Sequence, residues 1–120
     1  MVQKSITRKL TEMVLLCCAT VFCGMSLASA DDIAAGKKVA FDRKKGNCLG
    51  CHMMADGQLP GNIGPPLIAM KARYPDKAKL REQIWDATIA NPNTIMPPFG
   101  KHRILTEKEV DLITEFVYSL

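Results

Sequence analysis

Apolar residues recur at helical spacing in the middle of the chain. Within residues 74–92 the side chains Leu80, Ile84 and Ala87 fall three or four positions apart, which places them on one face of a helix. Asp76 is a suitable N-cap, because its carboxylate can accept a hydrogen bond from the first free backbone amides. The pattern predicts a helix that begins at Asp76 and ends where Pro92 disfavours helical backbone at Asn91.

The last fifteen residues show a second helical pattern. Thr106 and Glu109 have the spacing of a capping box, in which each side chain caps a backbone amide of the other residue. One apolar face follows, made of Val110, Ile113, Val117 and Leu120. We therefore predict a C-terminal helix that begins at Thr106.

A third helical segment is expected over residues 31–47. Ala35 and Val39 mark its apolar side, Asp31 or Asp32 can cap its start, and Gly46 is a plausible end. Residues 53–67 are irregular instead, because the three glycines and three prolines between 57 and 66 break both helix and strand. With no convincing strand alternation, the predicted class is all-α, with helices at both ends and loops around a cofactor.

The first thirty residues have the features of a secretory signal peptide. Basic residues precede an apolar run over residues 13–27, and the small residues Ala28 and Ala30 stand at −3 and −1 of a cleavage site. We expect cleavage after Ala30 and export to the periplasm. The alternatives are an uncleaved anchor and a lipoprotein site at Cys23, which bulky Phe22 disfavours.

Removing this leader changes the composition that matters. Residues 1–30 carry three basic side chains and one acidic side chain, so the net charge falls from +4 to +2 for residues 31–120. That charge gives no reason to expect a nucleic-acid partner. No second long apolar segment follows, so no membrane span is expected after cleavage. The remaining ninety residues make one small domain, which a bound cofactor would help to stabilise.

Only two cysteines remain after the leader, and they stand in a specific motif. Cys48, Cys51 and His52 form C-x-x-C-H, the signature of c-type haem attachment, in which two thiols bond to the haem vinyl groups and the histidine binds iron. A zinc site needs a fourth strong ligand, and only His102 is left among histidines and cysteines. A redox disulfide would need a βαβ context that the pattern lacks. We predict one covalent haem c.

The second axial ligand is best sought in the loop after residue 92. Met96 precedes two prolines, which fix two φ angles, remove two donors and keep Met96 extended. A stiff loop that presents one thioether suits axial ligation of haem iron. Met70, in a short helical stretch and more often a core residue, His102 and an open site are the alternatives.

Met53 and Met54 stand closest to the motif but are badly placed to bind the iron. Two residues span about 7 Å when fully extended, too little to pass round the macrocycle to the face opposite His52. We expect them to be adaptable apolar side chains on or near the haem edge.

Four segments together resemble the SoxX family, the small monohaem subunits of SoxAX cytochromes. They are "GNCLGCH", "LPGNIGPPL", "RYPDKAKLREQIWDATIANPNTIMPPFG" and "ILTEKEVDLITEFVYSL". The resemblance implies a class I cytochrome c fold with crossing first and last helices, and haem ligation by His52 and Met96. It suggests that the Pro65 carbonyl accepts a hydrogen bond from His52. Arg73 becomes a candidate partner of a haem propionate, or else a plain surface residue.

The resemblance also implies partners. A SoxX subunit pairs with SoxA as a heterodimer that couples thiosulfate oxidatively to a cysteine of the SoxYZ carrier, and electrons pass to an acceptor cytochrome c. With both cysteines bonded to haem and the iron six-coordinate, this chain has no group left for sulfur chemistry. That L-cysteine S-thiosulfotransferase activity would therefore sit on SoxA. The alternative is a freely diffusing monohaem electron shuttle.

Overall fold

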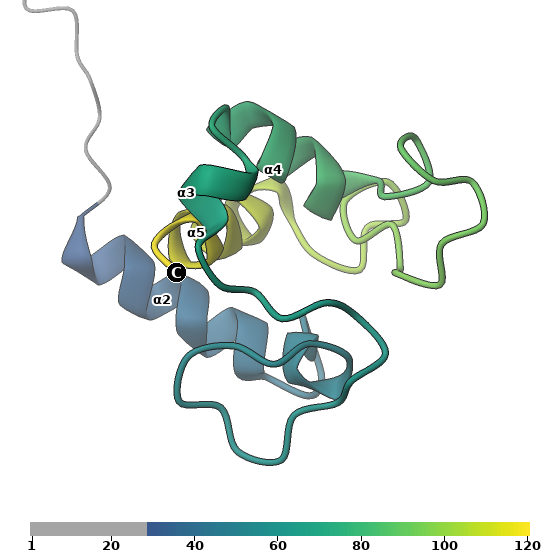
Figure 1. Ribbon diagram of the computed structural model, residues 1–120. Helices are drawn as coiled ribbons and strands as arrows, with labels where there is room; N and C mark the ends of the chain where they lie inside the picture. Colours follow the sequence, from purple (N-terminus) through teal and green to yellow (C-terminus); the bar gives the residue numbers. More distant parts are fainter. Residues whose placement is uncertain (1–28) are drawn as a thin grey trace, which may run out of the picture.

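A computed structural model of the chain describes residues 29–120 (Figure 1). Its helices are α2 (Ala30–Phe41), the short 3₁₀ helix η1 (Cys48–Gly50), α3 (Met70–Arg73), α4 (Lys77–Trp85) and α5 (Glu107–Tyr118). Over these residues there is no strand, and an isolated parallel bridge joins Met54 to Leu67. The all-α prediction is confirmed.

Helix α2 differs from its prediction at both ends. Its N-cap is Ser29 rather than Asp31 or Asp32, because Ser29 has an extended backbone and its hydroxyl accepts a hydrogen bond from the Asp32 amide. It ends at Phe41 rather than Gly46. The Asp42 carboxylate accepts from the Lys44 amide at 2.8 Å, and this local bond favours a turn over further helix.

Helix α4 begins as predicted and ends early. The Asp76 side chain accepts from the Ala78 amide at 2.9 Å, which confirms the predicted cap. The helix ends at Trp85, six residues before Asn91, and residues 87–90 form turns. The Asp86 carboxylate, which accepts from the Thr88 amide at 3.1 Å, again stabilises a turn in place of a helix.

Helix α5 confirms the predicted capping box. The Thr106 hydroxyl accepts from the Glu109 amide at 3.3 Å, and the Glu109 carboxylate accepts from the Thr106 amide at 3.0 Å. Lys45, from the turn after α2, forms an ion pair with the same Glu109 carboxylate. The Lys45 ammonium and the Thr106 amide both lower the pKa of Glu109.

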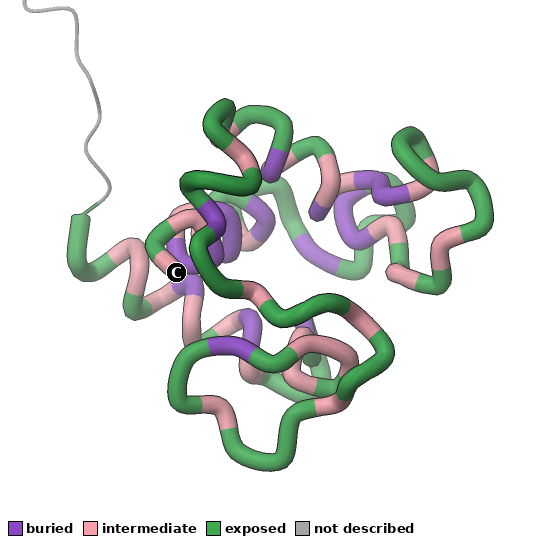
Figure 2. Tube along the Cα trace, in the orientation of Figure 1, coloured by how far each residue is buried: buried purple, intermediate pink, exposed green. Residues whose placement is uncertain are grey.

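The core lies where α2 crosses α5, so the first and last described helices pack on each other (Figures 1 and 2). Gly36 permits the close crossing, because a Cβ atom there would lie 2.0 Å from the Leu112 carbonyl oxygen of α5. Phe41 and Phe116 meet edge to face, with ring centroids 5.9 Å apart. Buried aliphatic residues of α5 complete this core, namely Val110, Ile113 and Val117.

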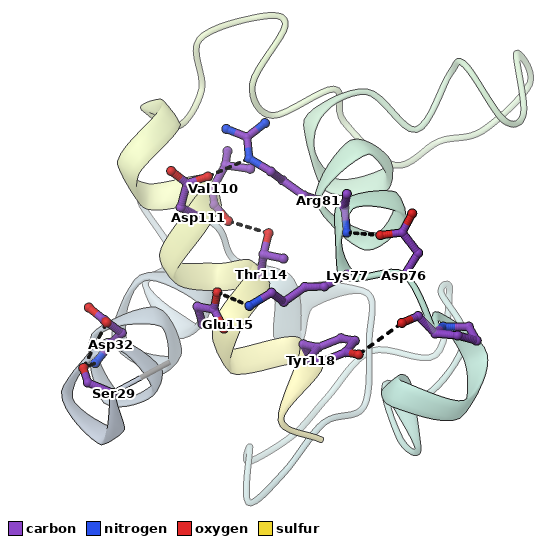
Figure 3. Close-up of polar contacts among 12 residues, drawn as sticks. Ser29, Asp32, Asp76, Lys77, Arg81, Val110, Asp111, Thr114, Glu115 and Tyr118 are labelled. Atoms are coloured by element: carbon purple, nitrogen blue, oxygen red, sulfur yellow. Dashed lines mark hydrogen bonds and ion pairs between the residues drawn. The ribbon is translucent and has the colours of Figure 1, made fainter. Parts of the chain in front are cut away.

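Helix α4 covers another side of α5 (Figure 3). Its buried residues are Leu80 and Ile84. Ion pairs at the edge of this contact, Lys77 with Glu115 and Arg81 with Asp111, are partly solvent-exposed and contribute about 1 kcal/mol each at most. The packing of α4 on α5 therefore depends mainly on apolar burial.

The predicted leader falls almost wholly outside the described residues, which begin at Ser29, and cleavage after Ala30 stays a prediction. Within residues 29–120 no helix has the length and apolar character needed to span a bilayer.

Candidate functional site

A cavity of about 500 Å³ lies between the helices and the two long loops. Its size is within the range of small-molecule and cofactor sites. The side chains that line it come from the turn after α2, from residues 63–67, from α3 and α4, from residues 94–99 and from α5. All six residues predicted to bind the cofactor line this cavity: Cys48, Cys51, His52, Pro65, Arg73 and Met96.

The two cysteines are held at the cavity wall by a tight turn. Asn47 adopts the left-handed conformation, with φ of 44°, and η1 follows it directly. The Cys48 carbonyl then accepts from the Cys51 amide at 3.2 Å and from the His52 amide at 2.9 Å. Burial raises the pKa of the free Cys48 thiol to about 11. The turn brings two thiols and an imidazole to one end of the cavity.

The His52 ring is fixed from two directions. Its Nδ1 lies 2.7 Å from the Pro65 carbonyl oxygen. Because a carbonyl oxygen can only accept, Nδ1 carries the proton in this contact, and Nε2 is left with a lone pair for a metal ion. Gly64 packs flat on the ring, and its amide donates to the Cys51 carbonyl at 2.8 Å. The contact between His52 Nδ1 and the Pro65 carbonyl is the one that the family resemblance suggested.

Gly64 is a site residue that the sequence reasoning missed. A Cβ atom there would lie 2.3 Å from His52 Cε1, 2.6 Å from Nδ1 and 2.8 Å from Nε2, so no side chain fits between this loop and the ring. The signal in the sequence was a glycine directly before the Pro65–Pro66 pair. Glycine is common before proline pairs in loops whatever it touches, so its contact with His52 could not be anticipated.

Met96 reaches the cavity from the loop between α4 and α5. Its amide donates to the Thr94 hydroxyl at 3.1 Å, which orders the backbone just before Pro97. Thr94 also lines the cavity and was not anticipated. The competing ligand His102 is exposed and does not contribute to the lining, whereas Met70 is 1% exposed and does. Met96 and Met70 are thus the two thioethers at the cavity.

Met53 and Met54 lie outside the cavity lining. Met53 is 48% exposed, and Met54 is buried in the hydrophobic core. Both were expected on or near the haem edge, but Met53 is a surface residue and Met54 is a core residue.

Arg73 lines the cavity while holding the loop that carries Pro65. One of its terminal guanidinium nitrogens, Nη1, donates to the Pro66 carbonyl at 2.7 Å and lies 3.5 Å from the Met70 sulfur. The contact links α3 to the loop residue next to Pro65. The suggested contact with a haem propionate stays a prediction.

The donor set fits a covalent haem better than the alternative metal. Two thiols, one imidazole with Nε2 available and a thioether line one cavity that is large enough for a cofactor. A structural zinc site requires four clustered ligands. Within residues 29–120 no three His, Cys, Asp or Glu side chains are arranged to hold a metal ion.

Comparison with known proteins decides the family. Residues 31–117 match the family model described as "Cytochrome C oxidase, cbb3-type, subunit III". The chain belongs to this family of c-type cytochromes. Membership implies a covalently bound haem c and a place in electron transport. The haem-attachment reading of Cys48, Cys51 and His52 agrees with it.

Two individual proteins resemble this cytochrome. An uncharacterized lipoprotein of Aquifex aeolicus (strain VF5) is 33% identical to this chain over 78 residues. These residues make up 63% of this chain and 37% of the relative, so the chain spans little more than a third of that protein. The crystal structure of SoxXA from P. pantotrophus superposes with a TM-score of 0.65 at 24% identity, covering 72% of this chain and 79% of the other. This likeness confirms the predicted class I cytochrome c fold, with its first and last helices crossed.

Proposed function

We propose that this cytochrome is the small electron-transfer subunit of a SoxAX-type complex in thiosulfate oxidation. It would carry one haem c, bonded to Cys48 and Cys51 and ligated by His52 and Met96. The proposal rests mainly on the cavity, which gathers these four side chains from segments up to 48 residues apart. The fold likeness to SoxXA and the four matching sequence segments support the choice of complex.

The proposed ligand pair suits outer-sphere electron transfer. When bound, a haem with histidine and methionine ligands exchanges one electron between its ferric and ferrous states, at a higher potential than a bis-histidine haem. Other residues of the chain hold the two proposed iron ligands in position. Pro65 fixes the orientation of the His52 ring, and the prolines after Met96 keep its sulfur in place.

The sulfur chemistry belongs on the partner subunit. Coupling a carrier cysteine to thiosulfate forms one S–S bond, breaks the S–H bond of the thiol, and releases one proton and two electrons. Cys48 and Cys51 are the only thiols of residues 31–120, and both are assigned to haem. This chain would take up the electrons one at a time and pass them to an acceptor cytochrome c. The carrier, a SoxYZ-type protein, would meet the complex through SoxA.

Export to the periplasm completes the proposal. The basic residues, apolar run and small residues of segment 1–30 support a cleaved signal peptide, and haem c is attached outside the cytoplasm in bacteria. Fractionation, with mass spectrometry of the mature N-terminus, tests this directly. The proposal predicts a periplasmic protein that begins at Asp31.

The alternative is a freely diffusing electron shuttle, which would use the same haem site. The fold likeness to SoxXA favours a subunit that works with a lasting partner.

Association with the second haem subunit tests the two candidates. Co-expressed with its SoxA-type partner, the mature protein should elute as a 1:1 heterodimer, and haem quantification should give one haem for this chain. A protein that stays monomeric beside its partner is a shuttle.

A further inference from the structure

The loop that carries Met96 is closed at its base. We call residues 86–101 the ligand loop; it leaves the end of α4, projects away from the helices and returns toward α5 (Figure 1). The Trp85 carbonyl accepts from the Gly100 amide at 3.1 Å and from the Lys101 amide at 3.3 Å. The two ends of the ligand loop are therefore joined through one backbone oxygen, that of Trp85, eleven residues before Met96.

A buried carboxylate lies at the same base. Asp86 is 4% exposed, and both of its oxygens are used. Oδ1 accepts from the Thr88 amide at 3.1 Å and from the Thr88 hydroxyl, while Oδ2 lies 2.8 Å from Lys101 Nζ. The Lys101 ammonium and the Thr88 hydroxyl lower the pKa of Asp86, so the carboxylate is ionised at neutral pH. One side chain thus ties the first turn of the ligand loop to its last residue.

The Asp86 side chain bonds to the ligand loop and not to α4. The Asp86 amide still donates to the Glu82 carbonyl of α4, but the side-chain bonds of Asp86 go to residues of the ligand loop. A buried carboxylate needs compensating partners, and here those partners stand at the two ends of the segment that presents Met96. Within the loop, the Thr94 hydroxyl accepts from the Met96 amide, and the two prolines after Met96 stiffen the segment that joins it to Lys101.

We propose that Asp86 and Lys101 are positioning residues for Met96, which keep the ligand loop closed and so hold the thioether at the haem iron. The inference rests on the proposed ligation by Met96. Opening of the base would let the loop move away and expose the coordination site. An added ligand then competes in proportion to the fraction of molecules that are open.

Imidazole titration of the ferric holo-protein measures that open fraction. Lys101→Met keeps the unbranched stem of the side chain and removes the ammonium group, at a position where the side chain is 55% exposed and folding should survive. It should raise the apparent imidazole affinity roughly ten-fold, because a charge-assisted hydrogen bond is lost. Asp86→Asn should do the same, and Lys101→Arg should restore the wild-type affinity.

The matched control is Lys79→Met. It removes an exposed ion pair with Glu82, whose two partners both belong to α4 and whose side chains bond to neither Asp86 nor Lys101. A purely structural role would lower the denaturation midpoint of the Lys101 variant without changing imidazole affinity. That result, or equal imidazole affinities for Lys101→Met, Lys79→Met and wild type, overturns the inference.

The spectrum of the wild-type protein separates this inference from the proposed function. If ferric wild type lacks the iron–sulfur charge-transfer band, the ligation by Met96 is wrong and the positioning role falls with it. If the band is present and Lys101→Met binds imidazole as wild type does, only the positioning role is wrong.

Discussion

Gly64→Ala should disturb the site without touching a proposed ligand. The nearest ring atom of His52, Cε1, would lie 2.3 Å from the new Cβ, whereas ordinary contacts begin at 3.4 Å, so the ring must move by about 1.1 Å. It cannot do so freely, because the adjacent Cys51 accepts a hydrogen bond from the Gly64 amide. The Nδ1 contact with Pro65, now 2.7 Å, would lengthen beyond hydrogen-bond range.

Two costs add in this variant. Forcing a methyl group into a packed site costs about 1–3 kcal/mol, and a lost hydrogen bond costs about 0.5–1.5 kcal/mol. We expect the free energy of unfolding of the holo-protein in denaturant to fall by about 2–4 kcal/mol. The reduction potential should also shift, because the contact with Pro65 tunes the basicity of the imidazole.

Gly50→Ala is the matched control for this experiment. Gly50 is exposed, in the same attachment turn, and its nearest neighbours are side-chain atoms of Asn47 at 3.0 Å, which can move aside. Neither Gly50 nor Gly64 has a positive φ, so both substitutions test steric fit alone. If Gly64→Ala unfolds within about 0.5 kcal/mol of the control, the account of the His52 ring is wrong.

Three further predictions concern the frame around the site. Gly36→Ala should destabilise the holo-protein by about 1–3 kcal/mol, because the new Cβ meets the Leu112 carbonyl. Alanine is the better helix former by about 1 kcal/mol, so a stabilised variant would contradict the tight crossing of α2 and α5. Thr106→Ala should cost about 1 kcal/mol in denaturant unfolding through loss of the capping box, and an unchanged midpoint would show that the cap contributes nothing. Glu109→Gln keeps the capping box but loses the ion pair with Lys45. Folding lowers the pKa of Glu109, so the ionised carboxylate stabilises the fold above about pH 4.3, and this stabilisation is lost as the pH falls through the lowered pKa. The unfolding free energies of wild type and variant should therefore differ at neutral pH and converge in acid.

Local features of the sequence predicted the starts of α4 and α5 correctly. The caps Asp76 and Thr106 act on amides two or three residues away, so their effect is visible in a short stretch of sequence. The ends of α2 and α4 were placed too late, because Asp42 and Asp86 are as acceptable inside a helical pattern as at a turn. The choice between the two depends on partners such as Lys101, fifteen residues further along the chain.

The candidate site divides in the same way. The attachment motif and Met96 carry chemistry that residue type and spacing reveal, and the structure brings both to one cavity. Gly36 and Gly64 matter because of what they touch, the Leu112 carbonyl and the His52 ring, and no local pattern records such a contact. Tertiary proximity, rather than propensity, determines which glycines are essential here.

Ligation by His52 and Met96 is the central claim, and the visible spectrum of the ferric Met96→Leu protein tests it most directly. Leucine keeps the volume and removes the sulfur, so haem should remain covalently attached through Cys48 and Cys51 while the iron–sulfur charge-transfer band disappears. Met70→Leu, at the other thioether of the cavity, should keep the band. A band that survives Met96→Leu, or one that is lost with Met70→Leu instead, would contradict the account.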